Sequence, residues 1–155
     1  MFTDDQIQQI MDMLIEYPDS KVYLGCDSVR FMKNGKRFAK YATVCIVHKD
    51  SSKGCRIFSH KSSEEDYDLK KNQPKMRMLT EVRKVVELYQ QIGPIIDGFD
   101  VEIHLDISAD PKQGSHCAAQ EATGYVLGMT QIEPKLKPES FASSFGADAV
   151  VHSKA

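Results

Sequence analysis

The sequence lacks the features of several common protein classes. No apolar run approaches the roughly 18 residues that a membrane-spanning helix needs, and the acidic, mixed N-terminus MFTDDQIQQI does not resemble a signal peptide. A CxxC pair is also missing, because the cysteines are scattered at Cys26, Cys45, Cys55 and Cys117. We therefore expect a cytoplasmic protein with reduced thiols, no membrane segment and no zinc knuckle.

Several catalytic signatures are also missing. The absence of HxxxH and HExxH disfavours a zinc protease. The sequence contains no phosphate-binding GxxxxGK[ST] loop, no GxGxxG and no GxSxG elbow. A formal net charge of -2 and a pI of about 6.2 are not those of a protein that coats nucleic acid without selectivity. Two local basic clusters remain, each most simply explained as solvated surface: Lys33, Lys36, Arg37 and Lys40, and then Lys70, Lys71, Lys75 and Arg77.

What the sequence does contain predicts one domain over residues 1–155, with 41% hydrophobic residues. Periodicity and turn residues predict these elements: a helix over 3–17 within an N-terminal extension (1–18), strands over 22–28, 37–48 and 55–62, a helix over 74–93 ending near Gly93, a strand over 100–110, a helix over 115–129, an edge strand over 132–137, and two final helices separated by a break at Gly146. The polar segment 61–73 predicts a mobile connection.

This order predicts an α/β fold with a five-stranded mixed sheet. The first three strands form an antiparallel meander, because the Asn34-Gly35 turn favours a hairpin. The long helix that follows implies a crossover to a strand parallel to the first. We expect two parallel strands beyond the meander, with helices flanking the sheet.

Two of the predicted strands end in an aspartate. The first ends in GCDS with Asp27, and the fourth contains HLDIS with Asp106. Ligands in open α/β sheets bind at the carboxyl ends of the strands. If these strands are neighbours, the two carboxylates face each other and repel unless a cation lies between them. Mg²⁺ or Mn²⁺ would suit such oxygen ligands.

Two further acids could complete the site. Glu81 lies near the start of the crossover helix, beside its apolar stripe, and Asp148 follows Gly146 in the last helix. Four carboxylates could hold two metal ions. Each also has an ordinary explanation: Asp27 could form a turn, Glu81 could be a surface residue, and Asp148 could be a helix N-cap.

Nearby polar residues could support these ligands. His104 shares a strand face with Asp106, and His152 lies one helical turn beyond Asp148. His116 opens the second long helix near the expected mouth of the site. For each histidine, an ordinary polar contact is the alternative.

The element order, together with the positions of Asp27, Glu81, Asp106 and Asp148, resembles the ribonuclease H-like superfamily. Asp27-Ser28 is similar to its first-strand Asp-x-Ser motif without the spacer, and ADAVVHS is similar to its final-helix motif. More narrowly, YLGCDS, HLDISADPK, EATGYVLG and PKLKPESFASSFGAD resemble the YkuK-type family, over nearly all of the chain beyond the first helix.

The resemblance implies a nuclease that hydrolyses phosphodiester bonds of RNA, DNA or a hybrid with two divalent metal ions. Asp27 and Asp106 would share the metals, and Glu81 and Asp148 would complete the sites. The superfamily also includes members that bind nucleic acid without cutting it, so a non-catalytic binding module for nucleic acid or protein is the alternative. A third possibility is an adaptor that docks through its N-terminal helix.

Overall fold

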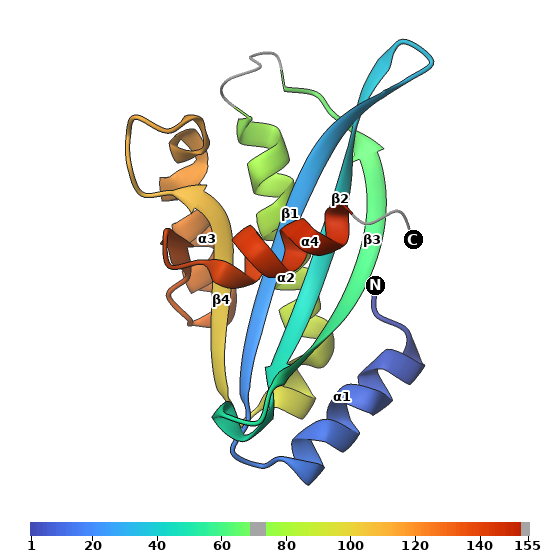
Figure 1. Cartoon of the computed structure of the whole chain (residues 1–155). Helices are drawn as coiled ribbons and strands as arrows, with labels where there is room; N and C mark the ends of the chain where they lie inside the picture. Colours follow the sequence, from blue (N-terminus) through green and yellow to red (C-terminus); the bar gives the residue numbers. More distant parts are fainter. Residues whose placement is uncertain (69–73, 153–155) are drawn as a thin grey trace.

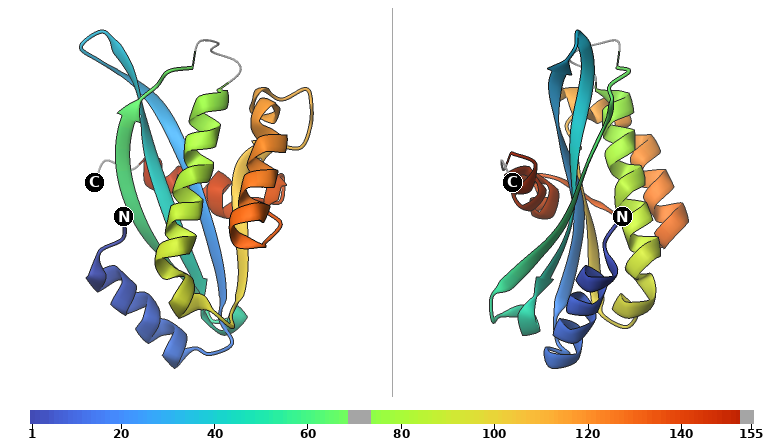
Figure 2. Two further views of the ribbon diagram at one scale, coloured as in Figure 1. Left: turned by 180° about the vertical axis from the view of Figure 1, so that it is seen from behind. Right: turned by 90° about the vertical axis from the view of Figure 1, so that its right-hand side faces the viewer.

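The computed structural model describes residues 1–68 and 74–152, and its centre is a five-stranded sheet with the strand order β3-β2-β1-β4-β5 (Figure 1). The strands are β1 (Lys21–Lys33), β2 (Lys36–His48), β3 (Cys55–Glu65), β4 (Asp100–Ser108) and β5 (Lys135–Lys137). The helices are α1 (Asp4–Glu16), α2 (Lys75–Ile96), α3 (Ala119–Thr130) and α4 (Asp148–Val151). Helices α2 and α3 cover one face of the sheet, and α4 lies on the other (Figure 2).

The pairing of the strands confirms the predicted fold class. Strands β1, β2 and β3 form an antiparallel meander, and β4 pairs with β1 in parallel. Strand β5 is also parallel to β4 and lies at the edge of the sheet. Among the described residues, no helix is both long and apolar enough to cross a membrane.

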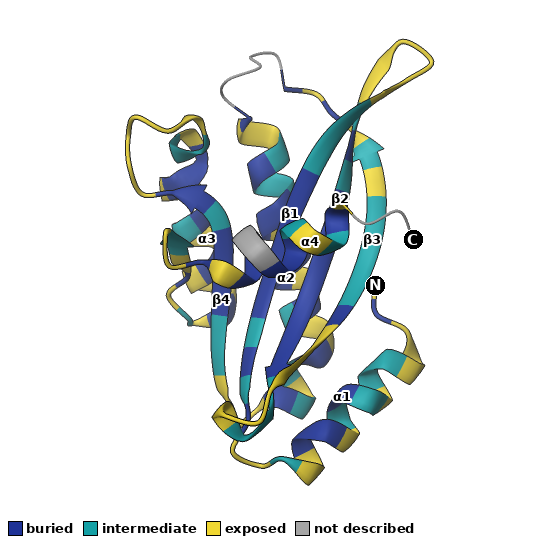
Figure 3. Ribbon diagram, in the orientation of Figure 1, coloured by how far each residue is buried: buried dark blue, intermediate teal, exposed yellow. Residues whose placement is uncertain are grey.

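The β1–β2 hairpin is longer than predicted. Strand β1 continues past the predicted end at Ser28 to Lys33, because its partly polar second half keeps an unbroken register with β2. The turn follows the Asn-Gly prediction, since Asn34 and Gly35 both have positive φ, at 52° and 77°. Cross-strand pairing, rather than burial, therefore extends this hairpin (Figure 3).

The main core lies between the sheet and helices α1 to α3. It is formed mostly by the alternating inward residues of β1, β2 and β4 and by the apolar stripe of α2. Helix α2 does not end near Gly93 as predicted but continues through Pro94 to Ile96. Ile92 and Ile96 are buried there, and a proline this close to the helix end removes little backbone hydrogen bonding.

Two segments differ from the prediction in ways that affect the site. The predicted mobile connection 61–73 begins inside β3, and Asp66 and Asp68 beyond that strand are buried; residues 69–73 lie outside the described part of the chain. The predicted break at Gly146 is wrong, because a π-helical turn (Ala142–Ala147) continues directly into α4. Gly146 instead allows close packing, since a Cβ there would lie 2.8 Å from Ile46 Cδ1.

Gly25 explains how the C-terminal helical segment reaches the sheet. A Cβ at Gly25 would lie 2.9 Å from the backbone nitrogen of Ser143 and 3.0 Å from the carbonyl carbon of Ala142. Only glycine permits this approach. This close contact holds the segment that carries Asp148 against β1. Because Gly25 lies two residues before Asp27 on the same strand face, the segment is held beside Asp27.

Candidate metal centre

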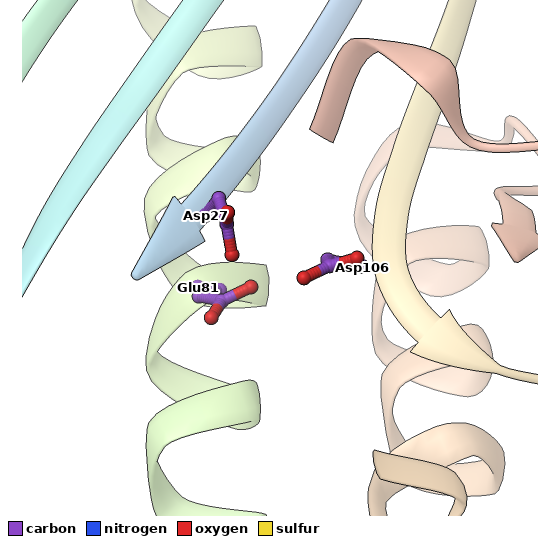
Figure 4. Close-up of side chains that lie close together, drawn as sticks. All are labelled: Asp27, Glu81 and Asp106. Carbon is purple, nitrogen blue, oxygen red and sulfur yellow. The ribbon is translucent and has the colours of Figure 1, made fainter. Parts of the chain in front are cut away.

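The site lies where strands β1 and β4 separate. Their parallel pairing runs from Lys21 and Asp100 to Cys26 and Leu105. The next residues in this register are Asp27 and Asp106. The two aspartates therefore lie side by side at the point where the pairing stops, as the sequence predicted (Figure 4).

Glu81 joins them from helix α2. One carboxylate oxygen from each of Asp27, Glu81 and Asp106 lies within 4.8 Å of the others. Asp27 and Glu81 are only 6% and 3% exposed, whereas Asp106 is half-buried. Figure 4 shows the three carboxylates pointing toward one another from two strands and one helix. The explanation of Glu81 as a surface residue is therefore wrong.

Ser28 holds two of the three carboxylates in place. Its backbone N–H donates to Asp27 Oδ1 at 2.8 Å, and its hydroxyl donates to Glu81 Oε2. Arg77 in turn donates to the carbonyl and hydroxyl oxygens of Ser28, at 3.2 and 3.0 Å. Glu81 Oε1 is buried and has no hydrogen-bond partner within the described part of the chain. An orphaned buried oxygen of this kind needs a partner such as a cation or a proton.

The electrostatics of the three acids follow from burial and mutual repulsion. Burial, and then the negative charge of Asp106, raises the pKa of Asp27 to about 8. Burial and the charge of Asp27 likewise raise the pKa of Glu81 well above its ordinary value, although Ser28 and Arg77 oppose this rise. In the absence of a cation, the site therefore retains protons at neutral pH.

Asp148 lies beside this group rather than within it. Hydrogen bonding with Asp148 contributes to the raised pKa of Asp27, so its carboxyl group reaches Asp27. It is the first residue of α4, and the N-cap is Ala147, so the N-cap explanation of Asp148 is wrong. Its Oδ1 lies 3.2 Å from His152 Nε2, and both side chains are about half exposed, at 49% and 58%. This pair forms the solvent-facing side of the site.

His104 shares a strand face with Asp106, as its spacing predicted, but its hydrogen bonds go to other groups than the three carboxylates. Its Nε2 lies 2.9 Å from Glu102 Oε1, and its Nδ1 accepts the backbone N–H of Ala142 at 3.1 Å. Both ring nitrogens are thus used away from the three carboxylates. Burial also lowers the pKa of this imidazole, which favours its neutral form. His104 therefore fixes the start of the C-terminal helical segment, together with edge-on contacts to Tyr23 and Phe141.

The sequence analysis missed two basic residues of the site. Lys137 Nζ on β5 lies 2.9 Å from Asp106 Oδ1, and no local pattern indicates this contact between two strands. Arg77 was assigned to a surface cluster. Its position four residues before Glu81, on the same face of α2, was the available signal. The third histidine, His116, bonds the carbonyl of Ser108 through Nδ1.

The donor set fits a hard divalent cation. It offers only carboxylate oxygens, which suit Mg²⁺ or Mn²⁺ better than a soft metal. A cation would offset the repulsion among the three acids and would give Glu81 Oε1 a partner. No cysteine belongs to this group of three acids.

A comparison with known protein families agrees with this architecture. The family model described as Ribonuclease H-like matches residues 5–152. No curated protein sequence matches the chain. A crystal structure of the Prototype Foamy Virus protease-reverse transcriptase is similar, with a TM-score of 0.46 and 9% identity. That alignment covers 86% of this chain but spans only 20% of the viral one.

Proposed function

Because the chain belongs to the ribonuclease H-like family, we propose that it is a divalent-metal-dependent nuclease that hydrolyses phosphodiester bonds of nucleic acid. One observation carries the proposal: three acids converge within 4.8 Å, and the most buried of them leaves one oxygen without a partner. A structural cluster would be expected to satisfy that oxygen from within the protein. The narrower resemblance to the YkuK-type family remains a prediction.

The proposed roles follow from the positions of the side chains. Asp27 and Asp106 would share the ions, Glu81 would complete one ion site, and Asp148 would complete the other from its exposed position. When bound, two Mg²⁺ or Mn²⁺ ions would supply the positive charge that activates water and stabilises the leaving oxygen. Ser28 and Arg77 orient the Glu81 carboxylate. His104 and Gly25 keep Asp148 near Asp27 by fixing the C-terminal helical segment.

The first experiment compares thermal unfolding with and without millimolar Mg²⁺ or Mn²⁺. Glu81→Gln and Glu87→Gln form a matched pair, because Glu87 lies on the same helix but forms an exposed ion pair with Arg83. We expect metal to raise the Tm of the native chain and of Glu87→Gln, but not of Glu81→Gln or Asp106→Asn. The native chain and Glu87→Gln should also cleave labelled RNA, DNA or hybrid duplexes, whereas Glu81→Gln and Asp106→Asn should not.

A non-catalytic binding module is the second candidate, and one observation favours it. Lys137 already lies 2.9 Å from Asp106, so part of the charge at the site is neutralised without a metal. If neither ion shifts the Tm of the native chain at millimolar concentration and no substrate is cut, the nuclease hypothesis is rejected. The hypothesis of a non-catalytic binding module then accounts better for the acidic cluster.

A further inference from the structure

Beyond the metal centre, strands β1 and β2 continue as a hairpin that extends past the rest of the sheet (Figures 1 and 2). We call residues 29–40 the arm. The arm contains five basic residues and no acidic one, in a chain whose formal net charge is -2. It begins two residues after Asp27 on the same strand, so the arm and the candidate metal centre form one continuous surface.

Strand alternation sorts the charges of the arm onto its two faces. Side chains two residues apart share a face, so Phe31 and Lys33 lie on the face of Asp27. Their partners on β2 lie on that face too: Lys33 pairs with Lys36, and Phe31 pairs with Phe38. The next positions on this face are Lys40 on β2 and Lys61 on β3. The face of Asp27 therefore carries lysines, a pair of phenylalanines and the exposed Glu65, which is the β3 partner of Phe38.

The two arginines of the arm lie on the opposite face and are already engaged. Arg30 forms ion pairs with Asp66 and Asp68, at 2.7 and 3.6 Å. Arg37 donates to the backbone carbonyl of Asp68 at 2.6 Å. These contacts fasten the arm to the segment that precedes α2. The arginines thus hold the arm, whereas the exposed Lys33 and Lys36 at its tip face solvent.

Between the metal centre and the tip lies an aromatic pair. The rings of Phe31 and Phe38 stack with centroids 5.7 Å apart and an interplanar angle of 21°. Both side chains are half-buried, and the groove beside them is lined by Lys33, Lys36 and Ser63. Lysines on either side of this pair suit a ligand with phosphate groups.

We propose that the lysine face of the arm binds the backbone of the nucleic acid whose phosphodiester bond lies at the metal centre. This inference rests on the proposed function and adds where the substrate lies. From Asp27 to Lys33 the strand spans about 20 Å at about 3.3 Å per residue. This length corresponds to about six base pairs of duplex. The arm would therefore hold the substrate about six base pairs beyond the scissile bond.

The test measures binding separately from cleavage. Fluorescence anisotropy with labelled RNA, DNA and hybrid duplexes of about 20 base pairs, roughly three times the span of the arm, would be recorded in Ca²⁺ over a range of salt concentrations. The arm variant is Lys33→Gln with Lys36→Gln. The matched control is Lys49→Gln with Lys53→Gln, which removes the same charge at the turn between β2 and β3. We expect the arm variant to bind more weakly, with a log–log salt slope about 2 shallower, and the control to match the native chain.

The outcomes separate this proposal from the nuclease. Equal weakening in both double variants, or no weakening in the arm variant, would overturn the proposal, and so would a native chain that binds none of the duplexes. If the native chain and the arm variant bind the duplexes with equal Kd and both cleave them in Mg²⁺, the proposed role of the arm is wrong, but the proposed nuclease function stands. Arm-dependent binding without any cleavage would support the arm and refute the nuclease.

Discussion

Within residues 1–68 and 74–152, buried acids gather in two clusters, and the negative charge of the two clusters is compensated differently. In the arginine-paired cluster, Arg30 contacts both Asp66 and Asp68, the first as an ion pair at 2.7 Å rather than an aligned hydrogen bond. The carboxylate of Asp68 also accepts the first backbone N–H groups of α2, from Met76 at 2.7 Å and Arg77 at 3.0 Å. This cluster is built as a helix cap with its own counter-charge.

The acids of the candidate metal centre have fewer charged partners among the residues that the structure describes. Asp27 and Glu81 receive hydrogen bonds from the backbone and hydroxyl of Ser28, and Lys137 contacts Asp106 from outside. Burial and then the charge of a neighbouring acid raise the pKa values of Asp27 and Glu81, and the contacts with Ser28 oppose this rise only in part. Burial of an acid alone therefore does not indicate an ion site. The partners of the buried acid do.

The largest expected effect is in the arginine-paired cluster. Asp68→Asn should lower the free energy of unfolding by about 3–5 kcal/mol, because it leaves the half-buried Arg30 side chain with one counter-charge fewer and weakens the cap of α2. Urea unfolding measures this loss. Asp110→Asn is the matched control, since the exposed Asp110 also accepts a backbone N–H, from Lys112 at 3.0 Å. A loss below about 1 kcal/mol would mean that the cluster does not stabilise the fold.

The same substitution in the metal centre should have the opposite sign. The folded-state pKa of Asp27 is about 8, well above the ordinary value of about 3.9. The folded state therefore holds the Asp27 proton more tightly than the unfolded state. This contribution to stability is complete below about pH 4 and is lost as the pH rises through about 8. Asn resembles the protonated acid, so Asp27→Asn should raise the Tm of the metal-free protein at pH 8, by about 5 °C.

The control for this prediction is the same variant at pH 4.5, where Asp27 is protonated in the folded native chain and the gain should be small. A variant that is less stable than the native chain at pH 8 without metal would contradict the prediction. It would mean that the Asp27 carboxylate is stabilised by the protein itself, as Asp68 is.

The sheet and the positions of the acids in the metal centre could largely be predicted from the sequence, because local patterns determine them. The period-two strands ending in Asp27 and Asp106, the Asn-Gly turn and the single crossover helix were enough to predict the sheet order. They also predicted that these two acids lie side by side. The sequence placed Glu81 beside the apolar stripe of its helix, and its exposure of 3% agrees with that position.

The remaining features depend on contacts between distant segments. Asp66 and Asp68 lie in the polar stretch SSEEDYD, and the partners that allow their burial include Arg30 and Arg37, more than 30 residues earlier in the sequence. His104 is 38 residues away from the Ala142 N–H that it accepts. Periodicity carries no information about such pairs. The sequence therefore predicted which acids meet but not which of them already have partners.

Metal binding at this centre should depend on pH, because the cation displaces a proton from the site. If a cation displaces the Asp27 proton, the apparent Kd for Mn²⁺ should weaken about tenfold for each pH unit below about 8, equivalent to about 1.4 kcal/mol per unit. Thermal shift at a fixed Mn²⁺ concentration measures this trend between pH 6 and 8. Asp106→Asn is the control and should show no shift at any pH. A Mn²⁺ shift of equal size at pH 6 and pH 8 would mean that Asp27 does not lose a proton on binding.

Arg77 offers the smallest and most specific test, because it touches both clusters. Its backbone N–H caps α2 through Asp68, whereas its guanidinium contacts Ser28 and lowers the pKa of Glu81. Arg77→Gln keeps the backbone contact and removes the charge. The pKa of Glu81 should rise further, and Mn²⁺ should bind about threefold more weakly, a change of about 0.7 kcal/mol.

Arg83→Gln is the matched control for Arg77→Gln, since Arg83 lies on the same helix and pairs with the exposed Glu64 and Glu87. Manganese titrations at pH 7 compare the two variants, and urea unfolding without metal measures their stabilities. If Arg77→Gln weakens Mn²⁺ binding but loses far less stability than Asp68→Asn, the cap and the metal centre are separable functions of one residue. If it loses as much stability as Asp68→Asn, the guanidinium belongs to the structural cluster, and the division between the two clusters fails at this residue.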